Sequence, residues 1–341
     1  MIYPRQIYKT LEIMNTKFKT LAFLFLALTS FVSCDNSDGS DDNVILPTSG
    51  AFKGITEKGI KRNTQNFTAT AGNGLITITS AKGVKLNING DCLTKNGNPV
   101  TGTIDIEYIE LFDKGNMLVT NKPTMGVTAD GNKNLLISGG EFFIKATQGG
   151  VELQTSCTMN LIVPTALTDG LDNAMTLWNG AIDDNGELAW RENKPNADGN
   201  GGGKGGVQGE GANYYVTFGN FGWANVDRFY SDPRPKTTLL VDVPEGYDNE
   251  NSAVYLSYDG EGTNALAKLD TYTAQGLFSE HYGQIPIGLA CHVIFVTEDN
   301  GQWRYAIKAV TVAANDIYTF TLAETTVGTE AQLVAAINAI Q

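Results

Sequence analysis

The chain of 341 residues carries 24 Lys and Arg against 37 Asp and Glu, a formal net charge of −13. At roughly 100–200 residues per domain, this length predicts two domains once an export segment is set aside. The acidic balance disfavours nucleic acid and anionic lipid headgroups as partners. The 38 glycines, with frequent Thr, Asn and Asp, favour short strands joined by tight turns.

Residues 1–33 predict an export signal. Lys17 and Lys19 precede the apolar run 21–28, and small and polar residues follow it. This order matches the three regions of a signal peptide, and the run is shorter than the ~20 residues that cross a bilayer. Because a well-formed signal opens at Met14, we expect translation to start there.

The end of this segment, Phe31-Val32-Ser33-Cys34, resembles the lipobox of bacterial lipoproteins. The resemblance implies cleavage before Cys34 and a lipid on its thiol. Residues 34–50 then form an acidic tether, since a charged, Gly- and Ser-containing stretch does not bury a core. Its Asp residues resemble the export signal of surface lipoproteins in Bacteroidota-type bacteria. This implies the outer membrane and the cell exterior, with the periplasmic face as the alternative.

Residues 51–192 predict a β-sandwich domain. Apolar and polar residues alternate with a period of two in several runs, and Gly-Asn turn clusters separate the runs. The inward-facing positions of these runs are Ile76 and Ile78, Val84, Leu86 and Ile88, Ile104, Ile106 and Tyr108, and Cys157, Met159, Leu161 and Val163.

A Gly-rich linker over 193–211 separates this domain from a second β domain over 212–341. The apolar run 289–296 predicts a central buried strand, with 303–307 as its hairpin partner after Asp299-Asn300-Gly301. The chain ends in a predicted helix with Thr329 as N-cap and Gln332 in a capping box. Leu333, Ile337 and Ile340 line the face that we expect to cover the second sheet. The fold class is therefore mainly β: two β-sandwich-like domains with a C-terminal helix, preceded by a lipoprotein signal peptide.

Three cysteines follow Cys34. Cys92 and Cys157 share strand parity with apolar neighbours, which favours two buried thiols over the disulfide that export would permit. Cys291 lies in an apolar run and is expected to be a buried thiol.

No complete catalytic or metal-binding motif appears. His281, beside Glu280, is interpreted as a surface-loop histidine rather than a metal ligand, and His292 as a hydrogen-bonded core or edge residue. The run 183–187 matches half of a calcium loop, and a solvated turn is the preferred interpretation. We expect no cofactor and no metal. A glycosidase-type carboxylate pair is set by distance in space, so the sequence does not test it.

The segment 214–230 is rich in aromatic residues next to polar ones. It supplies the candidate ligand-binding residues Trp223, Asn225, Asp227, Arg228 and Tyr230. Flat rings beside amides and carboxylates suit stacking on sugars, but aromatic rings also bury much area, and core packing is the preferred interpretation. Exposure of Trp178, Trp223 or Tyr230 would favour the sugar interpretation.

Several stretches carry a family resemblance: 95–102, IDIEYIELFDKGNMLVTNKPTMGV (104–127), LLISGGEFFIKATQGGVEL (135–153) and FGNFGWANVDRFY (218–230). Together they resemble a group of Bacteroidota-type secreted lipoproteins built from β-sandwich modules. The resemblance implies architecture and a surface location, and it transfers no catalytic residue.

These observations predict a non-catalytic cell-envelope lipoprotein, attached to the membrane by its lipid and exposed at the surface. It would act as an adhesion, scaffold or ligand-binding protein, with a glycan or a protein as ligand and no nucleic acid. The alternatives are a glycan-binding accessory lipoprotein of an outer-membrane nutrient importer, and a carboxylate-dependent hydrolase.

Overall fold

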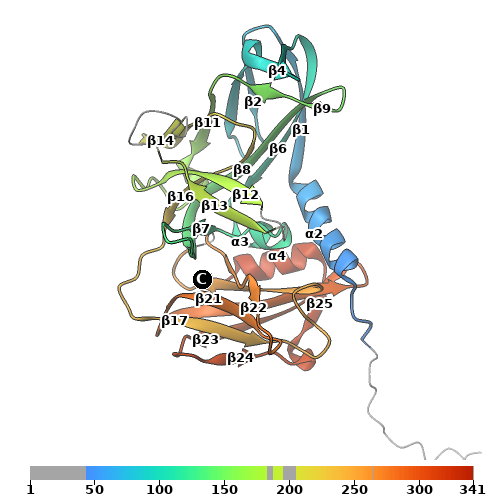
Figure 1. The fold of residues 1–341 in the computed structure, drawn as a ribbon, viewed down its shortest axis with the longest axis vertical. Helices are drawn as coiled ribbons and strands as arrows, with labels where there is room; N and C mark the ends of the chain where they lie inside the picture. The colour runs from blue at the N-terminus through green and yellow to red at the C-terminus, as the bar shows by residue number, and fades with distance from the viewer. Residues whose placement is uncertain (1–43, 183–186, 195–204, 263, 341) are drawn as a thin grey trace, which may run out of the picture. The chain divides into compact units, whose positions relative to one another are not determined.

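The structure is a computed structural model that describes residues 44–182, 187–194, 205–262 and 264–340. It is mainly β, and a helix lies at its C-terminal end, as the sequence predicts (Figure 1). From Leu46 onward the described residues belong to one compact unit. Their strands form five sheets, three before residue 230 and two after it.

The largest sheet has eight strands and closes on itself. Its strands are β1 (Thr64–Ala71), β6 (Gly102–Leu111), β7 (Met125–Val127), β8 (Lys133–Gln148), β9 (Val151–Glu152), β12 (Thr176–Ile182), β13 (Leu188–Glu192) and β16 (Gly222–Phe229). The short β7 pairs with β8 on one side and β13 on the other, so β8, β16, β12, β13 and β7 form a ring. This closure differs from the two open layers expected for residues 51–192.

Large rings pack around this closed sheet. Leu136, Trp178, Leu188 and Trp190 form one buried cluster, with Trp223 and Phe229 packed against it. Both buried indoles find acceptors: Trp178 Nε1 donates to the Asp227 carbonyl at 2.9 Å, and Trp190 Nε1 donates to the Pro123 carbonyl at 3.0 Å. The indole groups are therefore buried without losing a hydrogen bond.

A five-stranded sheet and a small three-stranded sheet complete the first group. They comprise β2 (Leu75–Thr79), β3 (Lys85–Asn89), β11 (Met159–Pro164), β14 (Gly205–Glu210) and β15 (Asn213–Phe218), and then β4 (Leu93–Lys95), β5 (Asn98–Pro99) and β10 (Gln154–Thr155). The predicted alternation is confirmed in β2, where Ile76 and Ile78 are buried and Leu75 is exposed.

The second group has a four-stranded and a five-stranded sheet. Their strands are β17 (Lys236–Asp242), β20 (Thr271–Tyr272), β21 (Phe278–Pro286) and β24 (Ile317–Thr319), and then β18 (Ser252–Tyr258), β19 (Ala267–Lys268), β22 (Ala290–Asp299), β23 (Gln302–Thr311) and β25 (Thr326–Gly328). The predicted β22–β23 hairpin is confirmed. Asn300 (φ +50°) and Gly301 (φ +84°) form its turn, in the left-handed conformation that such turns require.

The α-helices in the described part of the chain are α2 (Ser49–Asn63), α3 (Lys114–Val119) and α4 (Glu330–Asn338). Three single 3₁₀ turns accompany them: η1 (Gly90–Cys92), η2 (Thr165–Leu167) and η3 (Leu322–Glu324). The capping box of α4 is confirmed, with Thr329 as N-cap, and Leu333 and Ile337 are fully buried. In Figure 1, α3 and α4 lie between the two groups of strands, and their buried residues share one core with Ile294 and Trp303.

Helix α2 was not predicted. Thr48 caps its start, with its side chain accepting from the Ala51 N–H at 3.1 Å. Gly59 faces the backbone of Val119 so closely that a Cβ would collide with the Val119 carbonyl. The absence of a side chain at Gly59 therefore allows α2 to pack closely on α3.

The first group of strands extends further along the chain than the domain predicted over 51–192. Strands β14, β15 and β16 lie within 205–229, and they pair with strands of the first group: β15 with β11, and β16 with β8 and β12. Residues 205–210 were assigned to the flexible linker 193–211, yet they form β14, which pairs along its whole length with β15. A strand at a sheet edge needs only backbone groups to pair, so its glycines do not prevent this.

The two half-buried cysteines Cys92 and Cys157 form a disulfide, so the expectation of two buried thiols is wrong. Strand parity is a weak guide here because Cys92 ends η1 and Cys157 lies between β10 and β11. Cys291 is a buried free thiol, as predicted, and burial raises its pKa to about 12.

Among the described residues, no helix is long and apolar enough to cross a membrane. The signal segment, Cys34 and the acidic run after it lie outside the described residues, as do 183–186 of the half calcium loop and 195–204 of the expected linker.

Candidate functional site

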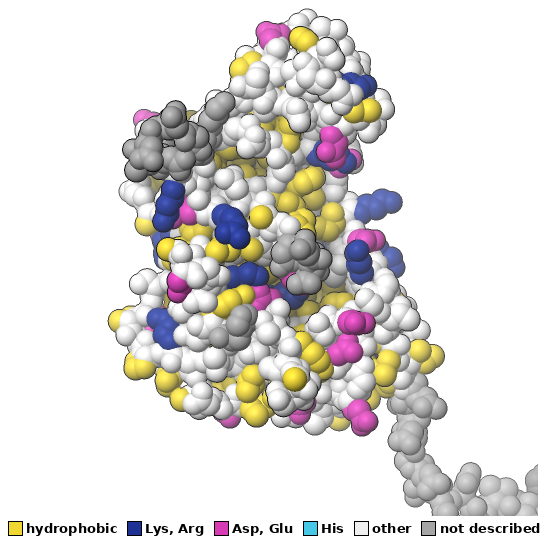
Figure 2. Space-filling model, viewed as in Figure 1, with side chains coloured by type: hydrophobic (Ala, Val, Ile, Leu, Met, Phe, Trp, Pro, Cys, Tyr) yellow, Lys and Arg dark blue, Asp and Glu magenta, His cyan; other side chains and the backbone are white. Residues whose placement is uncertain are grey.

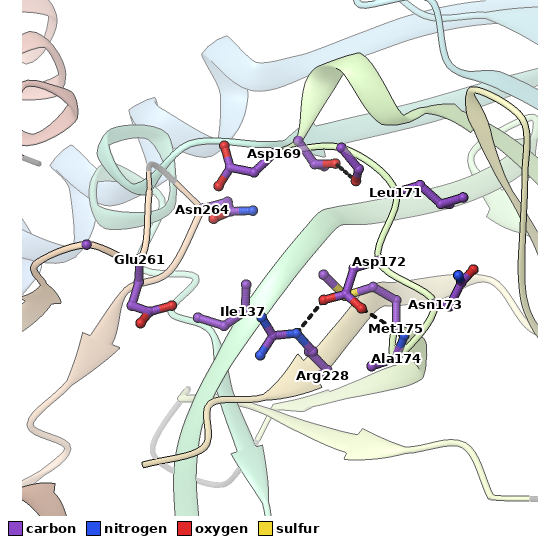
Figure 3. Close-up of a pocket in the computed structure, with 13 residues that line it drawn as sticks. Ile137, Asp169, Leu171, Asp172, Asn173, Ala174, Met175, Arg228, Glu261 and Asn264 are labelled. Atoms are coloured by element: carbon purple, nitrogen blue, oxygen red, sulfur yellow. Dashed lines mark hydrogen bonds and ion pairs between the residues drawn. The ribbon is translucent and has the colours of Figure 1, made fainter.

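A cavity of about 570 Å³ lies where three parts of the chain meet (Figure 3). One wall is the loop 168–175 between β11 and β12, and another is the turn after β18, with Gly260, Glu261 and Asn264. Ile137 of β8 and Arg228 of β16 line it between these loops. Its volume falls within the ~300–1,000 Å³ of small-molecule sites.

Hydrogen bonds to Tyr214 of β15, and one within the loop itself, fix the conformation of the loop 168–175. The fully buried Tyr214 hydroxyl accepts from the Asp172 N–H at 2.7 Å and donates to the Gly170 carbonyl at 3.1 Å. The Asp172 carboxylate accepts from the Ala174 N–H at 2.8 Å. Because these contacts fix both halves of the loop, the wall is formed before any ligand arrives.

One basic and one acidic group of the cavity are paired with each other. Arg228 Nε donates to Asp172 Oδ2 at 2.5 Å, and both side chains are about one third exposed. The pKa of Asp172 is lowered, first by the Ala174 N–H and then by the Arg228 guanidinium. The pair presents little net charge to the cavity.

Asn264 contributes a buried polar atom with no partner. Its residue is 4% exposed, and its Nδ2 donates to the Ser138 carbonyl at 2.5 Å. The Asn264 carbonyl in turn accepts from the Ser138 N–H at 3.2 Å. Within the described part of the chain, Oδ1 has no hydrogen-bond partner. An unpaired buried acceptor costs roughly 1–3 kcal/mol, which a donor brought by a ligand would recover.

Two carboxylates of the cavity are not paired. Asp169 is exposed and Glu261 half-buried, and among the described residues neither forms an ion pair. Gly262 (φ +68°) lies next to Asp169 and Asn264: a Cβ there would collide with Asp169 Oδ2 and lie 3.5 Å from Asn264 Oδ1. Glycine thus leaves room where two acceptor oxygens converge.

Next to the cavity lies a fully buried polar cluster of Ser138, Glu141, Asn225 and Asp227. Ser138 Oγ donates to Asn225 Oδ1 at 2.9 Å, and Asn225 Nδ2 donates to Asp227 Oδ2 at 2.5 Å. Burial raises the pKa of Asp227 well above its usual range. Burial, and then the charge of Asp227, raise the pKa of Glu141 in the same way, whereas Lys122 lowers it. Both acids therefore favour their neutral forms.

This cluster makes stability depend on pH. The folded chain holds the Glu141 proton more tightly than the unfolded chain does, because the pKa of Glu141 is raised on folding. The contribution of this proton to the free energy of unfolding is therefore full below about pH 4.5, and it is lost as the pH rises through the pKa of the folded state. The amide of Glu141→Gln mimics the protonated acid without titrating. We expect this variant to gain roughly 1–3 kcal/mol over the wild type as the pH is raised from 5 to 9.

Urea unfolding of both proteins across that range measures the difference. Glu57→Gln, an exposed change on α2, is the control and should follow the wild type at every pH. Parallel stability curves for wild type and Glu141→Gln would contradict the assignment of a buried neutral Glu141.

The structure brings only Arg228, of the five sequence-predicted site residues, to the cavity. Asn225 and Asp227 are buried in the polar cluster. The Trp223 ring contacts Phe143 (centroids 5.2 Å apart) and lies under the Lys122 ammonium. The half-buried Tyr230 ring meets Tyr258 edge-on at 5.1 Å.

Trp178, the remaining ring of the exposure test, is 1% exposed. These rings therefore serve packing, which agrees with the preferred interpretation of the segment.

The cavity residues Asp169, Glu261 and Asn264 were missed. In the sequence, Asp169 precedes Gly170, Glu261 lies in the Gly-rich turn 259–262 and Asn264 follows two positions later, which are ordinary turn signals. Nothing local marks them, because the site arises only when the Ser138–Asn264 contacts bring the turn onto β8.

Among the described residues, no group of three or more His, Cys, Asp and Glu side chains is placed to hold a metal ion. His281 lies in strand β21 rather than in a surface loop. Glu280 is 2% exposed, its carboxylate accepts from the Gly283 N–H at 3.2 Å, and burial raises its pKa to about 7. His292 Nδ1 contacts Asp259 Oδ1 at 2.7 Å, which fits the predicted hydrogen-bonded histidine.

The charge of the whole protein does not describe its local surface. On the face drawn in Figure 2, Lys and Arg side chains gather around the middle, next to Asp and Glu side chains. The charge of the cavity lining itself is therefore the better guide to a ligand than the net charge of −13.

Comparison with known proteins adds no relative: no protein-family profile matches the chain, and no curated protein is significantly similar to it.

Proposed function

We propose that this protein is a lipid-anchored lipoprotein of the outer membrane that faces the cell exterior and binds a small ligand without catalysing a reaction. The observation that carries the binding function is the cavity of about 570 Å³ with the buried, unpaired Oδ1 of Asn264 in its wall. A prebuilt wall and an unused acceptor are the features of a site that fixes the orientation of a ligand.

The buried acids Glu141 and Asp227 do not supply the carboxylate pair of a hydrolase. A hydrolase of the predicted kind needs two carboxyl groups facing a substrate across a cleft. The close acidic pair, Glu141 and Asp227, is fully buried, and neither residue lines the cavity.

The cavity supports a glycan that stacks on aromatic rings less well than a ligand held by hydrogen bonds and charge. Sugar recognition by stacking needs an exposed ring, yet Trp178 is buried and Trp223 packs on Phe143. The thirteen residues that line the cavity include no aromatic side chain.

The location rests on the sequence and on one structural feature. The lipobox-like Phe31–Cys34 and the acidic run after it are the sequence signals that support lipid attachment and the surface location. The Cys92–Cys157 disulfide supports export, because disulfides persist mainly in oxidising compartments. We also infer that the two sheets over 236–328 pack as a β-sandwich, since Phe295 of β22 meets Phe320, just after β24, at 6.0 Å.

Protease treatment of intact cells, with detection of fragments from residues 51–340, tests the location. The proposal expects these fragments to be released. Full protection, with release only after the outer membrane is permeabilised, would overturn the exterior location and leave the periplasmic face. Loss of membrane association in Cys34→Ala would support the lipid anchor, and unchanged association would contradict it.

A further inference from the structure

Three side chains of the cavity lining offer acceptors to a ligand, and the guanidinium of Arg228 and the amide of Asn173 are the donors beside them. The carboxylates of Asp169 and Glu261 accept hydrogen bonds and do not donate them when ionised. Asn264 offers only its Oδ1, because its Nδ2 is already bonded to the Ser138 carbonyl. A ligand that satisfies this wall must bring donors.

The charge of the lining points the same way. Three carboxylates and one guanidinium face the cavity, so their charges sum to −2. Arg228 is matched by Asp172, and the excess negative charge belongs to Asp169 and Glu261. A cleft of one sign attracts ligands of the other.

The acceptors are spread out rather than gathered around one point. In Figure 3 the Asp169 carboxylate lies beside Asn264, whereas the Glu261 carboxylate lies toward Ile137 and Arg228. Among the described residues, no three acidic, histidine or cysteine side chains converge as a metal ion requires. The side chains of Ile137 and Met175 supply apolar lining.

We propose that the cavity binds a small linear polyamine: two or more alkylammonium groups joined by methylene segments. One ammonium donates to Asp169 and Asn264 Oδ1, another pairs with Glu261, and the methylene chain lies against the apolar lining between them. This inference rests on the proposed binding function and names its ligand class.

Isothermal titration of the purified protein at low ionic strength tests the proposal. The probes are spermidine and 1,8-diaminooctane, with 1,8-octanediol as the matched neutral chain and octanedioate as the matched dianion. We expect the two amines to bind and the other two to give no heat. Asp169→Asn and Glu261→Gln should each weaken amine binding about tenfold, since each removes one charge-assisted contact.

Glu57→Gln is the matched control, because it removes the same charge from the exposed face of α2. It should bind the amines like the wild type. An equal loss in this control would show a general charge effect and overturn the assignment to the cavity.

The outcomes separate this inference from the proposed function. Binding of the diol or the dianion without the amines would overturn the polyamine and keep a ligand-binding cavity. Binding of a tetralysine peptide without the small amines would overturn the small-molecule class. A mixed library of charged and neutral small molecules that yields no ligand at all would overturn both.

Discussion

Replacement of Lys114 with methionine is expected to lower the free energy of unfolding by roughly 3–5 kcal/mol. The Lys114 side chain is fully buried in α3, and its Nζ donates to three acceptors: the Ile340 carbonyl at 2.7 Å, Ser257 Oγ at 3.0 Å and the Gly262 carbonyl at 3.1 Å. Methionine fills a similar volume but leaves these acceptors buried without a donor.

The three acceptors explain why one side chain has so large an effect. Ile340 follows α4, Ser257 lies in β18, and Gly262 belongs to the turn that walls the cavity. Lys114 therefore joins α3 to three segments that are distant in sequence. The same change should also weaken ligand binding, since Gly262 is no longer held.

Chemical denaturation of Lys114→Met and the wild type measures the loss. Lys58→Met, at an exposed position of α2, is the control and should shift stability by less than about 0.5 kcal/mol. If the two variants unfold at the same denaturant concentration, the buried hydrogen bonds of Lys114 do not stabilise the fold.

Loss of the Cys92–Cys157 disulfide is the second large expected effect. The bond closes a loop with a sequence separation of 65 residues. By the chain-entropy argument, a loop of this length restricts the unfolded chain enough to stabilise the protein by about 4 kcal/mol. The double variant Cys92→Ser, Cys157→Ser should lose about that much.

Treatment with a reductant separates the effect of breaking the disulfide bond from the effect of replacing the two cysteine side chains. Dithiothreitol should destabilise the wild type by a similar amount and leave the double variant unchanged, because Cys291 is already a buried free thiol in the described part of the chain. A wild type that unfolds at the same denaturant concentration with and without dithiothreitol would show that the bond does not stabilise the chain.

The local signals of the sequence were sufficient for several strands and for α4. Alternation placed Ile76 and Ile78 in the core, and Thr329 with Gln332 located the start of α4. Each of these signals lies within a few residues and acts through side-chain periodicity or a capping hydrogen bond. Such features do not depend on the rest of the chain, so they can be recognised before any fold is known.

Elements that depend on distant partners were missed or assigned differently. Helix α2 needs Gly59 because α3 lies against it, and β14 is a strand because the edge of β15 is available to pair. The disulfide needs Cys92 and Cys157 to meet across 65 positions, which parity along a strand does not show.

The sequence by itself determined an acidic, mainly β chain with a capped C-terminal helix. The tertiary structure decided where the sheets divide, which cysteines pair and where the cavity lies. Asp169 and Asn264 are 95 positions apart, and their acceptor oxygens converge because the side chain and the carbonyl of Asn264 form hydrogen bonds with the backbone of Ser138. A site built by long-range contacts leaves no period or spacing in the sequence, since no local interaction requires its residues to be where they are.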